Sequence, residues 1–213
     1  MKACSIRCRD RFIISVWVCM TNRGTDHTDM INLSLQRIEP VEKVLFIMDV
    51  LESERLLLIP FSLDLKKLTL ANKSKLAELL GVHVPEHWPQ KDFAEALPFF
   101  IGQMEQDPTH ATWDVITVHK ADKVVIGGIG CHGAPDEAGM VEIGYDIIPE
   151  YQRHGYATEM AGRFITWLFQ QPDIKVITAE CLDDNIGSIR VLEKVGMKRV
   201  GHDGDMIKWE LSA

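Results

Sequence analysis

The chain has 213 residues, which suffices for one α/β domain with a substantial core and is short for two domains. Its formal net charge of -8 argues against nucleic acid as a partner, because the phosphates of nucleic acids require a basic protein face. No stretch approaches the roughly 18 consecutive apolar residues that a membrane helix needs, so we expect no membrane partner either.

Five cysteines stand at irregular spacing without a Cys-x-x-Cys pair, so no disulfide framework is indicated. Cys131 and Cys181 lie in apolar, strand-like runs and are expected to be buried, inert thiols. This use of cysteine indicates a reducing compartment, hence the cytoplasm. The histidines are scattered along the chain, so we expect no metal site.

Residues 1–49 differ from the rest of the chain because they hold three of the five cysteines and show no sustained hydrophobic period. Either translation starts further on, at Met30 or Met48, or these residues are a poorly ordered extension. Basic residues precede an apolar run over 12–20, as in a signal peptide, but no small-residue cleavage site follows. We expect one regular domain over residues 50–213.

Seven short segments of this domain are continuously apolar or alternate in polarity, which is typical of β-strands. They are residues 54–60, 112–119, 123–130, 140–148, 176–181, 197–202 and 205–211. Short polar connections predict hairpins among the second, third and fourth strands, and Asp203-Gly204 predicts a last hairpin. The sequence therefore predicts a central mixed, mostly antiparallel sheet of about six or seven strands.

Between these strands, apolar residues recur at helical spacing. The segments are residues 62–80, broken near Ala71, and residues 93–106, 155–170 and 185–195. Asp92 and Glu95 resemble a capping box, and Pro98 predicts that the second helix restarts with the proline in its first turn. The order of elements indicates an α/β fold of the α+β type with helices on both faces of the sheet.

The most specific local feature is the turn Gln152-Arg153-His154-Gly155-Tyr156-Ala157, which opens a long helix. A helix start exposes unpaired N–H groups and the positive end of the helix dipole, so it can bind an anion. Gly155 lets an anion approach the backbone, and Arg153 can add charge-assisted hydrogen bonds. From the turn alone, a glycine that merely permits a bend stays an equal alternative.

Two motifs carry a resemblance to a known family. Gln-x-x-Gly-x-Ala at 152–157, following Ile143-Gly144-Tyr145-Asp146-Ile147, resembles the acetyl-CoA signature of the GCN5-related N-acetyltransferase (GNAT) superfamily. The segment 185–197 is similar to Asn-x-x-Ser-x-x-x-Leu-x-Lys-x-Gly-Phe of the branch with ribosomal-protein N-terminal acetyltransferases. The resemblance covers residues 50–213 and implies the GNAT fold, with acetyl-CoA as co-substrate and no metal.

The resemblance also implies which residues hold the cofactor. Backbone N–H groups of the turn would bind the pyrophosphate, the strand end would pair with the pantetheine arm between parted strands, and two residues of the second motif would contact that arm. The expected cofactor-binding residues are Asp146, Ile147, Ile148, Gln152, Arg153, His154, Gly155, Tyr156, Ala157, Asn185 and Ser188.

Acetyl transfer requires a neutral amine, whereas an alkyl ammonium has a pKa of roughly 10, so the site needs a proton acceptor. Glu142 is one candidate and shares a strand face with Gly144 and Asp146 by alternation. Glu180 on the next strand is the other, at a position where several family members place a catalytic glutamate. For each, a merely solvated or salt-bridged residue is the alternative. His132 and Asp136 are weaker candidates.

The departing thiolate needs a proton donor. Many family members use a tyrosine seven residues after the asparagine, but Leu192 stands there in this chain. The expected donor shifts to Ser188, with Tyr145 and Tyr156 as substitutes. A helical serine can equally bond back to the backbone, so that alternative stays open.

The resemblance places the acceptor pocket between residues 63–88 and the helix over 93–106. Trp88 and Tyr145 are the expected substrate contacts, although Trp88 could equally anchor its loop to the core. We expect an N-acetyltransferase that moves acetyl from acetyl-CoA to a primary amine by direct attack, the amine being a small molecule or a peptide N-terminus. The alternative is a non-catalytic acyl-CoA-sensing module. Many relatives dimerise, so a homodimer is also allowed.

Overall fold

The computed structural model describes residues 48–106 and 113–213, which form one eight-stranded sheet with the strand order β1-β2-β3-β4-β5-β6-β8-β7. The strands are β1 Leu51–Glu52, β2 Leu56–Pro60, β3 Asp114–His119, β4 Val124–Cys131, β5 Met140–Ile147, β6 Val176–Leu182, β7 Lys198–Asp203 and β8 Met206–Ser212. Residues 1–47, which contain nearly all of the expected N-terminal extension, lie outside the described residues.

The sheet is mixed, as expected, and has one strand more than the upper limit of the prediction. Neighbours pair antiparallel throughout except for β5 and β6, which run parallel. The additional strand is β1, whose Leu51 pairs with Leu58 at the edge of the sheet. Two residues are too few to show a period in a sequence, so β1 could not be predicted. The hairpin of β7 and β8 is confirmed.

The helices are α1 Leu63–Ala71, α2 Lys73–Leu80, α3 Lys91–Gln106, α4 Tyr156–Leu168 and α5 Ile186–Lys194, with a 3-10 turn, η3, over Pro149–Tyr151. The expected break near Ala71 is confirmed. Asn72 ends α1, and its side chain then caps α2 by accepting a hydrogen bond from the Lys75 backbone N–H.

The predicted restart at Pro98 is wrong, because α3 runs through Pro98 as one helix. Proline removes one helical hydrogen bond, yet packing on both sides holds the segment together. Leu97 is fully buried, and the rings of Phe93 and Phe100 lie 6.2 Å apart on one face of the helix, spanning the proline.

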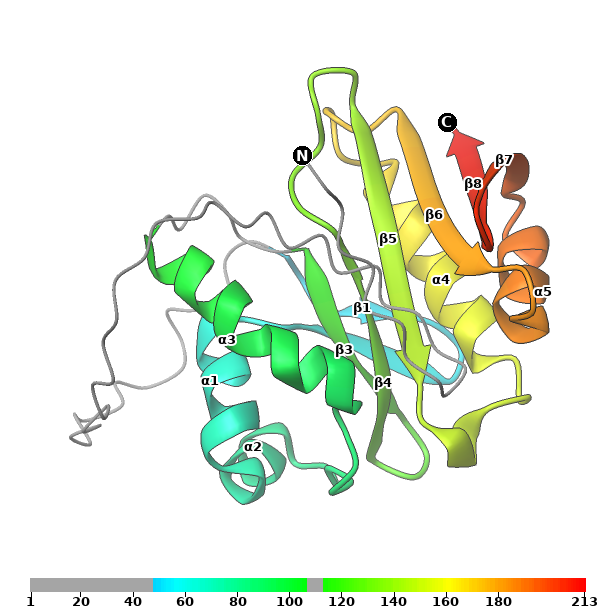
Figure 1. Cartoon of the computed structure of the whole chain (residues 1–213). Helices are drawn as coiled ribbons and strands as arrows, with labels where there is room; N and C mark the ends of the chain where they lie inside the picture. The colour runs from blue at the N-terminus through cyan, green and yellow to red at the C-terminus, as the bar shows by residue number, and fades with distance from the viewer. Residues whose placement is uncertain (1–47, 107–112) are drawn as a thin grey trace.

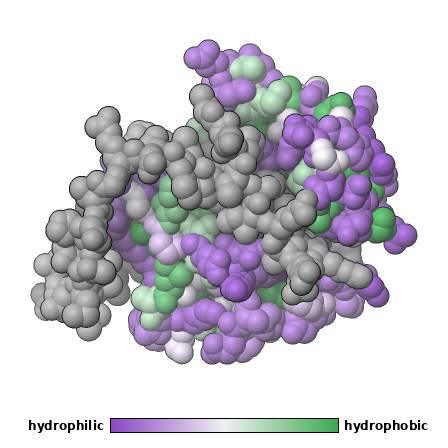
Figure 2. All heavy atoms as spheres, viewed as in Figure 1, coloured by the Kyte–Doolittle hydropathy of each residue, from purple (hydrophilic) through white to green (hydrophobic). Residues whose placement is uncertain are grey.

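The sheet separates two layers of helices (Figure 1). Helices α1, α2 and α3 lie in front of the sheet in this view, and α4 lies behind it with α5 at its side. The inner face of α4 carries buried residues such as Met160, Phe164 and Leu168, so this helix closes the main core against the strands. The surface seen from the same side is mostly hydrophilic, with apolar residues in small groups (Figure 2).

No helix within residues 48–106 and 113–213 combines the length and apolarity needed to cross a membrane. In the same residues, no group of three or more His, Cys, Asp and Glu side chains is arranged to hold a metal ion.

Candidate active site

The parallel strands β5 and β6 form a fork. They pair only from Met140 with Val176 to Glu142 with Thr178, and both strands continue beyond that point without pairing to each other (Figure 1). On its other side, β5 stays paired with β4 as far as Ile147. The edge of β5 that faces β6 therefore offers backbone N–H and C=O groups to an extended ligand laid between the strands.

The turn after β5 leads from this fork to the start of α4. Arg153 and Gly155 both have positive φ, 64° and 83°, which turns successive backbone N–H groups to one side as in anion-binding nests. The N-cap residue of α4 is Gly155, which has no side chain to cap the helix. The Gln152 side chain donates a hydrogen bond to the carbonyl of Ile147 at 2.9 Å and so ties the turn to the end of β5.

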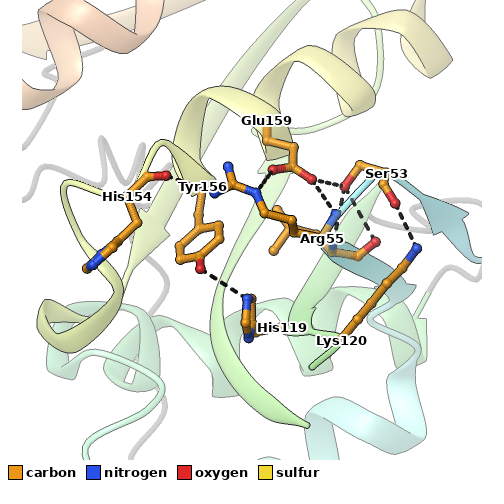
Figure 3. Close-up of polar contacts among 8 residues, drawn as sticks. Ser53, Arg55, His119, Lys120, His154, Tyr156 and Glu159 are labelled. Atoms are coloured by element: carbon orange, nitrogen blue, oxygen red, sulfur yellow. Dashed lines mark hydrogen bonds and ion pairs between the residues drawn. The ribbon is translucent and has the colours of Figure 1, made fainter. Parts of the chain in front are cut away.

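An ion pair that the sequence analysis missed fixes the first turn of α4 (Figure 3). Arg55, the residue before β2, donates to Glu159 through its backbone N–H and its Nε, each at 2.7 Å. Ser53 Oγ donates to the same carboxylate at 2.7 Å. Burial alone would raise the pKa of Glu159, but these hydrogen bonds lower it, so the carboxyl stays charged.

The Arg55 guanidinium also reaches the turn itself. It lies 4.4 Å from the centre of the Tyr156 ring, and its Nη1 donates to the carbonyl of His154 at 3.1 Å. The hydroxyl of Tyr156 lies 3.0 Å from Nε2 of the buried His119 (Figure 3). Tyr156 thus helps to hold the turn, and the structure does not bring it to Ser188.

The two predicted carboxylates lie at the base of the fork. Glu142 stands at its last paired position, and Glu180 lies two residues beyond the paired Thr178. Burial, followed by the nearby charge of Glu142, raises the pKa of Glu180, and Lys208 at 3.8 Å partly opposes this. His132, one of the weaker candidates, lies next to Glu142, with 3.2 Å between its Nδ1 and Glu142 Oε1. The other, Asp136, caps its own loop by accepting from Ala138 and Met140.

The two predicted hydroxyls meet behind the fork. Tyr145 on β5 and Ser188 on α5 lie 2.9 Å apart, oxygen to oxygen. Burial raises the pKa of Tyr145, so its hydroxyl stays protonated and can donate. Asn185 caps α5 by accepting from the Ser188 backbone N–H, and Leu192 is fully buried in the core.

A pocket opens in front of the fork, on the side of α1 to α3. Four aromatic rings from three separate segments wall it: Phe61, Trp88, Phe93 and Phe100. Its floor is backbone of β4 and β5, where Gly130 pairs with Gly144. The enclosed space is about 60 Å³, room for a compact group of atoms. Trp88 is only 2% exposed, so it both lines the pocket and anchors its loop.

Of the two aspartates that line this pocket, one is paired with a lysine and, within the part of the chain that the structure describes, the other is not. Lys66 is fully buried, and its Nζ donates to Asp114 Oδ2 at 2.7 Å and to the carbonyl of Phe61 at 2.8 Å. Asp146, by contrast, has a buried Oδ2 without a hydrogen-bond partner among the described residues. Burial raises the pKa of Asp146 to about 7, and a hydrogen bond from the Gly128 backbone only partly opposes this.

Two of the five cysteines lie within the described residues. Cys131 and Cys181 are buried free thiols, as predicted, and burial raises the pKa of both. Each therefore stays a protonated, inert thiol near neutral pH.

Comparison with known proteins assigns the family. The acetyltransferase (GNAT) domain family matches residues 55–198. The chain is 35% identical over 150 residues to the uncharacterized N-acetyltransferase YjdG of Bacillus subtilis (strain 168), which covers 70% of this chain and 89% of that protein. The chain therefore belongs to the GNAT acetyltransferase family.

Solved structures share the fold at low sequence identity. The ribosomal-protein-S5-alanine acetyltransferase of Vibrio fischeri superposes with a TM-score of 0.57 and 16% identity, covering 78% of this chain and 97% of that one. The microcin self-immunity acetyltransferase MccE, solved with acetyl-CoA and AMP, gives 0.53 and 14%, covering 76% of this chain and 94% of that one. Such identities establish the common architecture alone.

Proposed function

We propose that this protein transfers an acetyl group from acetyl-CoA to a primary amine by direct attack in a ternary complex. The observation that carries the proposal is the fork between β5 and β6, which leads directly into the uncapped N-terminus of α4. An extended pantetheine arm needs an open strand edge, and a pyrophosphate needs converging N–H groups. Both features stand next to each other along one segment of the chain.

In this proposal the cofactor is held mainly by backbone. The N–H groups from Arg153 to Ala157 bind the pyrophosphate, and the open edge of β5 at 146–148 pairs with the pantetheine arm. Asn185 and Ser188, at the start of α5, contact the arm from the β6 side. Gln152 acts on the turn rather than on the ligand, because its amide is bonded to Ile147.

The acceptor amine must lose a proton before or during its attack on the acetyl carbon. Glu142 and Glu180 are the proposed proton acceptors. His132 extends the reach of Glu142, because its imidazole lies between that carboxylate and the pocket: a side chain on Gly144 would meet His132 Nε2 at 2.7 Å. His132 Nδ1 makes no hydrogen bond within the described residues, so Glu142, at 3.2 Å, acts on the imidazole through its charge.

The new C–N bond forms as the C–S bond breaks, and the departing thiolate takes a proton. The Ser188 and Tyr145 hydroxyls are the proposed donors. Their contact lets the proton that Ser188 gives up be replaced from Tyr145. This pair stands in for the tyrosine that other family members carry at the position of the buried Leu192.

A thiol-release assay with acetyl-CoA and a panel of amines tests the proposal. We expect amine-dependent release of CoA and formation of the acetylated amine. Tight CoA binding without turnover on any amine would instead favour the alternative, a sensing module of the same fold, for which the missing tyrosine is the supporting feature.

A further inference from the structure

The pocket in front of the fork has a composition that selects its occupant. We propose that the acceptor is a primary amine carried on a compact apolar or aromatic group and lacking a neighbouring carboxylate, with Asp146 receiving its ammonium. This inference rests on the proposed function, since it names the substrate class of the same site.

The unpaired carboxyl group in the pocket favours a positively charged ligand. Lys66 and Asp114 neutralise each other at 2.7 Å, and His132 lies beside Glu142 at 3.2 Å. Asp146 is the acidic group of the pocket lining that has no such partner among the described residues. A buried carboxyl oxygen without a hydrogen bond is costly, and an ammonium would satisfy it with a charge-assisted hydrogen bond.

Asp146 is also placed where the amine has to be. It lies on β5 within the unpaired part of the fork, and alternation puts its side chain on the same face as Gly144 and Glu142. An ammonium at Asp146 therefore lies beside the strand edge that would carry the thioester. The carboxyl acts here in recognition, while Glu142 and Glu180 remain the proposed proton acceptors.

The walls select the rest of the acceptor. The rings of Trp88 and Phe93 lie 6.0 Å and 6.2 Å from Phe61, and Phe100 lies 6.2 Å from Phe93, so the rings form a continuous aromatic surface. Such a surface favours an apolar substituent, which leaves water on entering. The internal space between these rings is about 60 Å³, which favours a compact substituent over an extended one.

The floor is kept free of side chains, so the amine can approach the strands. A Cβ on Gly130 would lie 2.7 Å from Asp114 Oδ1, and one on Gly144 would lie 2.7 Å from His132 Nε2. Side chains at these two positions would therefore collide with the polar groups that surround the floor. Their absence leaves bare backbone between the aromatic walls and the fork.

The same charges reject an acceptor that carries a carboxylate next to its amine. Lys66 lies behind the pocket lining, and its Nζ is already bound to two lining residues, the carboxylate of Asp114 and the carbonyl of Phe61. A substrate carboxylate would enter beside Asp146 and Asp114, and no lysine or arginine of the described residues lines the pocket to receive it. Desolvating the carboxylate there is unfavourable. Free amino acids are therefore expected to be much poorer acceptors than the amines and amides of the same side chain.

A matched set of acceptors tests this selectivity. Isopentylamine, leucinamide and leucine share one apolar group and differ in the carboxyl position, and ethanolamine has no apolar group. Thiol release with acetyl-CoA is measured for each. We expect kcat/KM for isopentylamine to be about tenfold or more above the value for ethanolamine. The value for leucine should be about a hundredfold below that for isopentylamine, and leucinamide should be close to isopentylamine.

Two variants connect the selectivity to its residues. Asp146→Asn should raise KM for isopentylamine by about tenfold or more while acetyl-CoA affinity, measured by calorimetry, stays unchanged. Phe100→Ala should reduce the preference for isopentylamine over ethanolamine. Asp173→Asn, an exposed aspartate outside the pocket, is the control and should change neither quantity.

The outcomes separate this inference from the proposed function. Equal rates with leucine and isopentylamine, or an Asp146→Asn variant with unchanged KM, would overturn the inference and leave acetyl transfer standing. Absence of turnover with every amine, whether or not CoA binds, would overturn the proposed function and the inference with it.

Discussion

Replacing Asp146 with asparagine tests the electrostatics of the pocket without a substrate. The two side chains have nearly the same shape, but asparagine carries no charge at any pH. The pKa of Asp146 is raised from 3.8 to about 7 by burial, so folding forces this carboxyl toward its protonated form.

The sign of the effect follows from proton binding. Between pH 3.8 and pH 7 the folded protein holds a proton on Asp146 that the unfolded chain has lost, so stability falls as the pH rises through this window. A change of about three pH units corresponds to an upper limit of about 4 kcal/mol in the free energy of unfolding. About 2 to 3 kcal/mol of this is lost between pH 5 and pH 8.

Urea unfolding followed by tryptophan fluorescence measures this, because Trp88 and Trp209 are buried. We expect the difference in the free energy of unfolding, Asp146→Asn minus wild type, to increase by up to about 2 to 3 kcal/mol between pH 5 and pH 8, because only the wild type loses stability there. The exposed Asp173→Asn variant should differ from the wild type by the same small amount at every pH. A difference for Asp146→Asn that stays constant or shrinks as the pH rises would refute the reasoning.

Three further predictions concern the cofactor site and the base. Gly155→Val should raise the CoA dissociation constant about tenfold or more with the circular dichroism spectrum preserved, because a β-branched residue is strained at φ 83° and shifts the N–H groups of the turn. Unchanged affinity would rule out the phosphate turn. Glu159→Gln should lower the free energy of unfolding in urea by about 1 to 3 kcal/mol and weaken CoA binding. Glu105→Gln, in an exposed ion pair, should lower it by less than about 1 kcal/mol. Equal losses in the two variants would contradict the anchoring role of Glu159. Glu142→Gln and Glu180→Gln should differ in kcat, with the true base losing turnover mainly at low pH, where solvent cannot deprotonate the amine; normal rates in both would mean that neither is the base.

Local features of the site could be predicted because each depends on residues that are close together in the sequence. The turn around Gly155 depends on backbone conformations within a few residues. The cap at Asn185 is equally local, although the sequence analysis assigned that residue only to the cofactor. Strand alternation likewise placed Glu142 and Asp146 on one face. Hairpin spacing gave the neighbourhood of β4 and β5, and so the approach of His132 to Glu142 could have been inferred from register.

Features that join distant segments could not be predicted from one sequence. The anchor between Arg55 and Glu159 links residues separated by 104 positions, and only a carboxylate in the first helical turn hinted at it. The aromatic pocket assembles rings from the residue after β2, a loop and α3, so its size depends on packing that no local pattern encodes. The isolation of Asp146 depends in turn on that packing and on the glycines of β4.

Helix α3 shows that contacts between residues can also override a local preference that the sequence does indicate. Pro98 predicts a boundary by its own chemistry, but contacts between Phe93 and Phe100 outweigh that local preference. The two-residue β1 is likewise stabilised by its neighbour β2 rather than by its own sequence.

The central claim, acetyl transfer from acetyl-CoA to an amine, is tested most directly by thiol release together with mass spectrometry of the acceptor. The full-length protein is incubated with acetyl-CoA and isopentylamine, with each reactant omitted in turn. We predict CoA release that requires the amine and an equal amount of acetylated amine. CoA that binds tightly but yields no acetylated product with this or any other primary amine would contradict the account.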